Sequence, residues 1–122
     1  MPRFAVLDHD WPHPHRDLFF ERGGVLKAWR LPPAFDLASP VPAVAIGDHR
    51  PVYLDYEGPV SGGRGRVTRW DGGELEWERH SADDIVVRLG GTHLRGRFQL
   101  VRADGDEWVM SALAPAAGVC HT

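Results

Sequence analysis

Glycine and proline interrupt this chain too often for long helices to form. The 122 residues include 14 glycines and 10 prolines, and a proline inside a helix costs about 3 kcal/mol because it removes a hydrogen bond and clashes with the preceding turn. Apolar residues keep a helical period for no more than about two turns. What remains is a series of short segments in which polar and apolar residues alternate between turn signals. The sequence therefore predicts a mainly β protein.

The turn signals divide the chain into strands and hairpins. Residues 17–31 (DLFFERGGVLKAWRL) are expected to form a hairpin about Gly23-Gly24. With a two-residue loop there, Asp17 lies directly opposite Arg30. The same signals predict several further elements: a second hairpin with its turn at Asp71-Gly72-Gly73, three strands over 84–113 broken at 90–91 and 103–106, one or two strands over 40–58, and a surface connection with one short helical turn over 31–42.

Many short antiparallel strands at this spacing favour a small closed antiparallel β-barrel with short helical turns. A chain of 122 residues is long enough for a single domain with one core. We expect the domain to span residues 1–114 and residues 115–122 to form a flexible tail, because the last residues are small and polar.

Composition narrows the classes of protein to which the chain can belong. Hydrophobic residues make up 43% and charged residues 25%, which is typical of a globular domain. No apolar run approaches the roughly 20 residues that cross a bilayer, so no membrane partner is expected. The single cysteine, Cys120, excludes an intrachain disulfide and favours a cytoplasmic location. A net charge of −3 argues against general polyanion binding.

The segment HDWPHPHRD (residues 9–17) places three of the seven histidines beside two aspartates. On the predicted strand His15 and Asp17 share one face, and the bend at Trp11-Pro12 can bring His9 back to them. Two imidazoles and a carboxylate suit manganese, zinc or iron, with manganese favoured where the other ligands are oxygen. We expect this metal site in the mouth of the barrel. The alternative is an exposed turn, since short His/Asp motifs often arise by coincidence.

A second cluster occurs in DHRPVY. If this segment is extended, His49, Pro51 and Tyr53 fall on one face. A histidine and a phenol so placed can protonate a leaving oxygen or hold a phosphate oxygen. The alternative is a turn histidine beside a half-buried strand tyrosine.

Taken in order, five segments resemble the 3′-phosphoesterase domain of bacterial DNA ligase D. The match extends from Pro2 to about Leu113, and its pieces are PRFAVLDHD…HRDLFFERGGVLKAWRLP, DHRPVYLDYEG, RVTRWDGGELE, GTHLRGRFQLVR and EWVMSAL. Lys27 and Trp29 match the family's LKSW piece, and LRGRF matches its LKGRW strand. The resemblance implies a compact β-barrel that removes 3′-phosphates and ribonucleosides with manganese during end joining.

The same resemblance assigns expected roles to individual residues. His9, His15 and Asp17 stand at the family's metal-binding places, with manganese as the expected metal and zinc as the alternative. His49 and Tyr53 stand at the places of the catalytic pair that binds phosphate and transfers a proton. The implied partners are DNA or RNA-tipped 3′ ends and a separate DNA ligase or polymerase.

Three departures from the family pattern affect phosphate binding. Phe19 replaces the motif arginine that contacts phosphate, the family's upstream segment with its Arg-Asp pair has no counterpart in this sequence, and the glycine-rich loop is shortened to PVSGGRG. By the hairpin register Arg30 points to the same side as Asp17, so we hypothesise that Arg30 supplies the phosphate contact. The alternative is that Arg30 pairs with Asp17 or reaches solvent. Without compensation we expect a slow enzyme or one with a different substrate.

Two other classes of protein compete with the enzyme. One is a non-catalytic, metal-containing module that binds DNA ends or a repair partner, and the other is a structural domain with a vestigial site. For the module, a basic track along the DNA backbone is conceivable from Arg64, Arg66, Arg69, Arg95 and Arg97, although ordinary solvated strand faces give the same pattern. Trp11 can stack on a nucleobase or simply pack in the turn.

Overall fold

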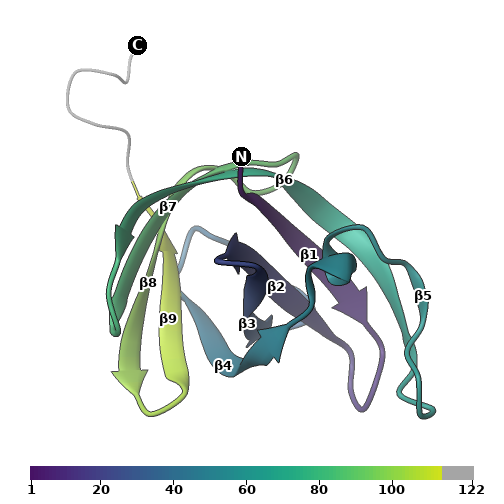
Figure 1. Cartoon of the computed structure of the whole chain (residues 1–122). Helices are drawn as coiled ribbons and strands as arrows, with labels where there is room; N and C mark the ends of the chain where they lie inside the picture. The colour runs from purple at the N-terminus through teal and green to yellow at the C-terminus, as the bar shows by residue number, and fades with distance from the viewer. Residues whose placement is uncertain (114–122) are drawn as a thin grey trace.

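Eight strands close into an antiparallel barrel in the computed structural model, which describes residues 1–113 (Figure 1). Their order around the barrel is β1-β2-β3-β4-β9-β8-β7-β6, and pairing of β1 with β6 closes it. The fold class predicted from the sequence is confirmed. The elements are β1 (Arg3–His9), β2 (His15–Arg22), β3 (Val25–Leu31), β4 (Val41–His49), the 3-10 helix η1 (Pro51–Leu54), β5 (Gly58–Pro59), β6 (Arg66–His80), β7 (Asp84–Gly90), β8 (Arg95–Asp104) and β9 (Glu107–Ala112).

The first hairpin forms in the predicted register. Gly23 and Gly24 have φ angles of 61° and 84°, the positive values that a two-residue hairpin turn needs at both positions and that glycine adopts without strain. Asp17 therefore pairs with Arg30. The predicted breaks between β7, β8 and β9 are also observed.

The predicted turn at Asp71-Gly72-Gly73 is wrong, because β6 runs through it without interruption. Neither glycine has a positive φ. Instead the missing side chain of Gly73 allows β7 to approach β6 closely, since a Cβ atom at Gly73 would collide with the carbonyl group of Gly90. Gly73 thus lets β6 pair with both β1 and β7 at this point, and the missing side chain of Gly72 leaves room for the Arg69 guanidinium.

Asp71 is buried and ties β6 to the turn between β7 and β8. Its carboxylate accepts backbone N–H hydrogen bonds at 2.6–2.9 Å from four residues: Gly72, Thr92, His93 and Leu94. A buried carboxylate with this many donors holds a fixed backbone arrangement. These hydrogen bonds explain why the Asp71-Gly72-Gly73 motif begins with an aspartate although it does not form a turn.

Asp71→Ala should lower the free energy of unfolding by about 3 kcal/mol, because it leaves buried N–H groups without an acceptor. Urea denaturation measures the change. Asp71→Asn keeps one acceptor oxygen and should cost less, while Asp106→Ala, at an exposed position, should change stability by less than about 0.5 kcal/mol. A cost below about 1 kcal/mol for Asp71→Ala would contradict this role.

Apolar side chains cover both faces of β1, β2 and β3. The larger cluster fills the barrel and includes Phe4, Leu18 and Trp29. The smaller cluster lies on the opposite face, as strand alternation requires, and η1 contributes to its cover: Ala5, Leu7, Phe19, Leu26, Ala28, Leu54 and Val67. Odd-numbered residues of β1 and β2 therefore point away from the barrel interior.

The remaining expectations concern the connections and the end of the chain. Segment 31–42 contains a turn closed by the Ser39 N–H and the Asp36 carbonyl group, and the short helical element lies at η1. The domain boundary at 114, the tail 115–122 and Cys120 fall outside the described residues. None of the helices in residues 1–113 has the length and apolar character to span a membrane.

Candidate metal and phosphate site

The chain folds so that His9, His15 and Asp17 meet. His9 ends β1 and His15 begins β2, and the two residues are direct partners in the antiparallel register. Their ring centroids lie 4.8 Å apart, and one ligand atom from each of the three side chains lies within 4.8 Å of the others. The predicted convergence is observed. It occurs on the outer face of the sheet rather than in the barrel mouth, because these odd-numbered residues face away from the interior core.

Hydrogen bonds to backbone carbonyl groups orient both imidazoles. His15 Nδ1 lies 2.7 Å from the carbonyl oxygen of His13, and His9 Nε2 lies 2.8 Å from that of Arg64. Because a carbonyl oxygen only accepts, each of these nitrogens carries the proton that it donates. The other ring nitrogen of each neutral histidine is then a free lone pair.

Both lone pairs point at the carboxylate of Asp17. His9 Nδ1 lies 3.1 Å from Asp17 Oδ2, and His15 Nε2 lies 3.1 Å from Asp17 Oδ1. His15 Nε2 and Asp17 Oδ1 are buried and have no hydrogen-bond partner among the described residues. Acceptors that face one another in this way repel unless a cation or additional protons lie between them.

The three side chains therefore fit a divalent metal ion. Two imidazole nitrogens and one carboxylate oxygen, with the ring orientations set by carbonyl groups, form a common protein ligand set. The donor types admit manganese, zinc and iron alike. His13, considered as a spare ligand, is exposed and contributes its backbone oxygen to the orientation of His15.

A cavity of about 240 Å³ opens beside the three side chains His9, His15 and Asp17, which we call the candidate metal site. Five of the six predicted site residues line it together with Trp11 and Arg64. The full lining is Leu7, His9, Trp11, Asp17, Phe19, Arg30, His49, Tyr53, Val60, Arg64 and Val67. The sixth residue, His15, lines a neighbouring cavity of about 260 Å³ with Asp8 and Arg66.

His49 and Tyr53 meet at the wall of the cavity, but not through an extended segment as predicted. His49 ends β4, and Pro51 then begins η1, which carries Tyr53. The two rings lie edge to face with centroids 5.8 Å apart. His49 Nδ1 lies 2.7 Å from the carbonyl oxygen of Gly47, so Nε2 is the ring nitrogen left for a ligand.

Phe19 occupies the space next to this pair. Its ring centroid lies 5.0 Å from that of His49 and 6.2 Å from that of Tyr53, and the side chain is 1% exposed. The position is therefore an apolar support for the two rings and offers no hydrogen-bond donor to a ligand.

Two arginines approach the cavity from different sides. Arg30 lies across from Asp17 on β3, and its side chain forms no ion pair within residues 1–113. Arg64 lies in the loop between β5 and β6, where its guanidinium donates to Ser61 O at 2.7 Å and Ser61 Oγ at 3.2 Å. The sequence analysis considered Arg64 only as part of a basic track and missed its position at this cavity. The glycines on both sides of Arg64 are the one sequence signal for it, because they let the β5–β6 loop fold back toward His9.

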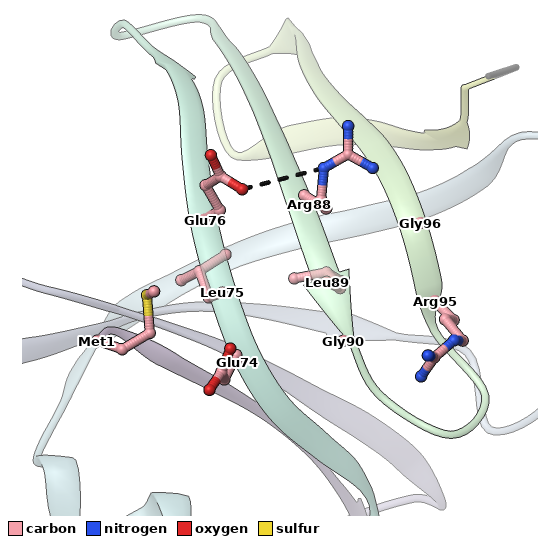
Figure 2. Close-up of a pocket in the computed structure, with 9 residues that line it drawn as sticks. All are labelled: Met1, Glu74, Leu75, Glu76, Arg88, Leu89, Gly90, Arg95 and Gly96. Atoms are coloured by element: carbon pink, nitrogen blue, oxygen red, sulfur yellow. Dashed lines mark ion pairs between the residues drawn. The ribbon is translucent and has the colours of Figure 1, made fainter. Parts of the chain in front are cut away.

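The other arginines of the proposed track do not line this cavity. Arg97 pairs with Glu78 at 2.8 Å, and Arg69 donates to the backbone oxygen of Leu54. Arg95 borders a separate hollow of about 380 Å³ on β6, β7 and β8, where Figure 2 shows Glu76 and Arg88 facing each other. These contacts favour the interpretation of ordinary strand faces over a continuous track.

Comparison with known proteins places most of the chain in one family. Residues 7–102 match the model of the DNA Ligase D 3′-phosphoesterase domain. The chain is 33% identical over 119 residues to the multifunctional non-homologous end joining protein LigD of Mycobacterium bovis and 34% identical over 112 residues to that of Pseudomonas aeruginosa. These alignments cover 90% and 84% of this chain but only 16% and 13% of the relatives. The chain thus spans between about an eighth and a sixth of their length.

Proposed function

This chain belongs to the family of DNA ligase D 3′-phosphoesterase domains, and on that premise we propose that it is a metal-dependent phosphoesterase that processes DNA 3′ ends in non-homologous end joining. The substrates are ends that carry a 3′-phosphate or a terminal ribonucleoside. The observation that carries the proposal is the meeting of His9, His15 and Asp17 at one point, beside a cavity that also contains His49 and Tyr53.

The residues of the cavity divide the chemistry of phosphate ester hydrolysis among them. A divalent cation held by His9, His15 and Asp17, manganese first and zinc second, would supply positive charge at a phosphoryl oxygen and lower the pKa of a water molecule. Water adds to phosphorus and the bond from phosphorus to the leaving oxygen breaks. The leaving oxygen is the 3′ oxygen of the strand for a 3′-phosphate and the 5′ oxygen of the terminal ribonucleoside for a ribonucleotide end, and in each case it takes a proton.

The Gly47 carbonyl group accepts the hydrogen bond from the proton on His49 Nδ1, so Nε2 can donate only when the ring is doubly protonated. In that form Nε2 either donates to a phosphate oxygen or supplies the proton to the leaving oxygen, and the Tyr53 hydroxyl group orients the phosphate.

Arg30 replaces the phosphate contact that Phe19 cannot make. Its place across from Asp17 puts it on the wall of the same cavity, and a guanidinium can hold two phosphate oxygens at once. Arg64 also borders the cavity, but Ser61 already accepts hydrogen bonds from its Nε and Nη2 atoms. Arg30 is therefore the better candidate.

Arg30→Ala should lower kcat/KM for a 3′-phosphorylated primer about a hundredfold, because loss of one charged donor to the transition state costs about 3 kcal/mol. It should also weaken binding of inorganic phosphate to the manganese-loaded protein, as measured by calorimetry. Arg64→Ala is the matched control and should stay within about threefold of the unmodified chain. Loss of phosphate binding in Arg64→Ala with little change in Arg30→Ala would assign the contact to Arg64 instead.

The activity itself is tested on two DNA primers, one with a 3′-phosphate and one ending in a single ribonucleotide. With manganese we expect release of inorganic phosphate from the first and removal of the ribonucleoside from the second, and neither product after chelation of the metal. Absence of turnover with manganese and with zinc would overturn the proposal.

The burial of Phe19 in place of a charged donor favours one second candidate, a metal-containing module that binds DNA ends without turnover. Such a module would retain affinity for the 3′-phosphorylated primer in the same experiment and release no phosphate. Binding to a separate ligase or polymerase and a cytoplasmic location stay predictions from the sequence.

A further inference from the structure

Trp11 is a large apolar side chain left open to solvent at the edge of the metal site. It is 44% exposed and lines the same cavity as His9 and Asp17. The other four tryptophans each have another aromatic ring beside them: Trp29 and Trp108 contact each other, Trp70 contacts Phe35 and His93, and Trp77 contacts Phe20 and His80. Within residues 1–113, Trp11 has no such partner.

The backbone that carries Trp11 is nevertheless held in place. The Asp10 carboxylate accepts the Arg66 N–H at 2.8 Å, and the Asp10 N–H donates to the Arg66 carbonyl oxygen at 3.3 Å. Gly65 packs directly against the loop, since a Cβ atom there would lie 2.6 Å from the Cβ atom of Trp11. The loop from β1 to β2 is thus held against the start of β6, while the Trp11 side chain stays partly exposed.

We propose that Trp11 stacks on the terminal nucleobase of a DNA 3′ end when the phosphate of that end lies at the candidate metal site. This inference rests on the proposed function, because it needs a nucleotide phosphate beside His9 and Asp17. The sugar and base of that nucleotide must continue from the phosphate toward the rim of the cavity, where Trp11 lies. A partly exposed indole on a backbone held against β6 offers a flat apolar surface for the base.

Stacking also suits the substrate class. Every base has a π face, so an aromatic platform accepts all four bases with little preference. An enzyme that trims ends must accept whichever base is terminal. Trp11 therefore serves as a binding residue for the end of the strand without reading its sequence.

The test compares two 3′-phosphorylated single-stranded primers, one complete and one whose last nucleotide is abasic. Affinity for the manganese-loaded full chain is measured by fluorescence anisotropy. The unmodified chain should bind the complete primer about tenfold more tightly. Trp11→Ala should lose this preference through weaker binding of the complete primer alone, whereas Trp11→Phe should retain most of it. Val101→Ala, which truncates an exposed side chain on β8, should behave like the unmodified chain.

The outcomes separate this inference from the proposed function. Equal affinity of the unmodified chain for the two primers would overturn stacking without involving any variant, so a poorly folded Trp11→Ala cannot obscure the result. An equal loss for both primers in Trp11→Ala would assign Trp11 a structural role and overturn stacking as well. If removal of the 3′-phosphate leaves primer affinity unchanged, the phosphate does not bind at the candidate metal site. That result would contradict the proposed function as well as the stacking.

Discussion

Replacement of His15 by alanine should abolish specific manganese binding and phosphate release together. His15 supplies one of only two imidazole nitrogens in the cluster, and its ring is held by the carbonyl group of His13. Altering even the groups that orient a metal ligand typically costs about 10–100-fold in affinity, so we expect loss of the ligand itself to cost more than about a hundredfold. Isothermal titration calorimetry with manganese measures the affinity of the variant for the metal.

His13→Ala is the matched control for this variant. His13 is exposed, and it contributes only its backbone oxygen to the cluster, which the substitution retains. We expect its manganese affinity to stay within about twofold of the unmodified chain. Equal affinity in His15→Ala and the unmodified chain would contradict the assignment of His15 as a ligand.

Thermal unfolding separates loss of the metal site from loss of the fold. A metal at a hundred times its Kd stabilises the protein that binds it by about 2.7 kcal/mol. Manganese should therefore raise the unfolding temperature of the unmodified chain and of His13→Ala, and should leave that of His15→Ala unchanged. A cooperative transition in His15→Ala without manganese would show that the variant folds.

Replacement of His49 by alanine should reduce turnover about 10²–10⁴-fold, the usual contribution of a group that transfers a proton, and leave manganese affinity unchanged. The two effects separate because His49 lies on β4 and Tyr53 on η1, whereas the proposed metal ligands lie on β1 and β2. Between them the Phe19 ring of β2 packs against His49. Single-turnover phosphate release and manganese titration measure the two quantities independently.

His49→Gln distinguishes the two roles proposed for the ring. Glutamine can donate a hydrogen bond to phosphate but cannot deliver a proton at neutral pH. Rescue of both phosphate affinity and rate would indicate a phosphate donor, and rescue of affinity alone would indicate the proton source. His80→Ala removes an exposed histidine outside the cavity and should retain full activity. Full activity in His49→Ala would exclude both roles.

The first hairpin shows why part of the site could be predicted from the sequence. Two adjacent glycines with positive φ require a two-residue turn, and this turn alone sets which residues of β2 and β3 face each other. The position of Arg30 across from Asp17 follows from that register. Neither relation depends on a residue more than about fifteen positions away.

The Asp71-Gly72-Gly73 motif shows where such reasoning fails. Aspartate followed by two glycines has the composition of a turn, but the partners of the Asp71 carboxylate include Thr92, His93 and Leu94, about twenty residues later. Gly73 allows the close approach of β7, and Gly72 leaves room for the Arg69 side chain on the same strand. Local composition does not distinguish a turn from a crossing of this kind.

The sequence by itself determined the residue types of the candidate metal site, their spacing, the face shared by His15 and Asp17, and the pairing of β2 with β3, because strand alternation and tight turns are local properties of the backbone. Only the tertiary structure decided that the candidate site lies outside the barrel, that the Arg64 carbonyl group orients His9, that Phe19 packs against His49, and that Trp11 stays partly exposed. These features depend on closure of β1 against β6 and on the cover by η1 and the β5–β6 loop. Such contacts join residues tens of positions apart. They are determined by the packing of the whole chain and not by the residues adjacent in sequence.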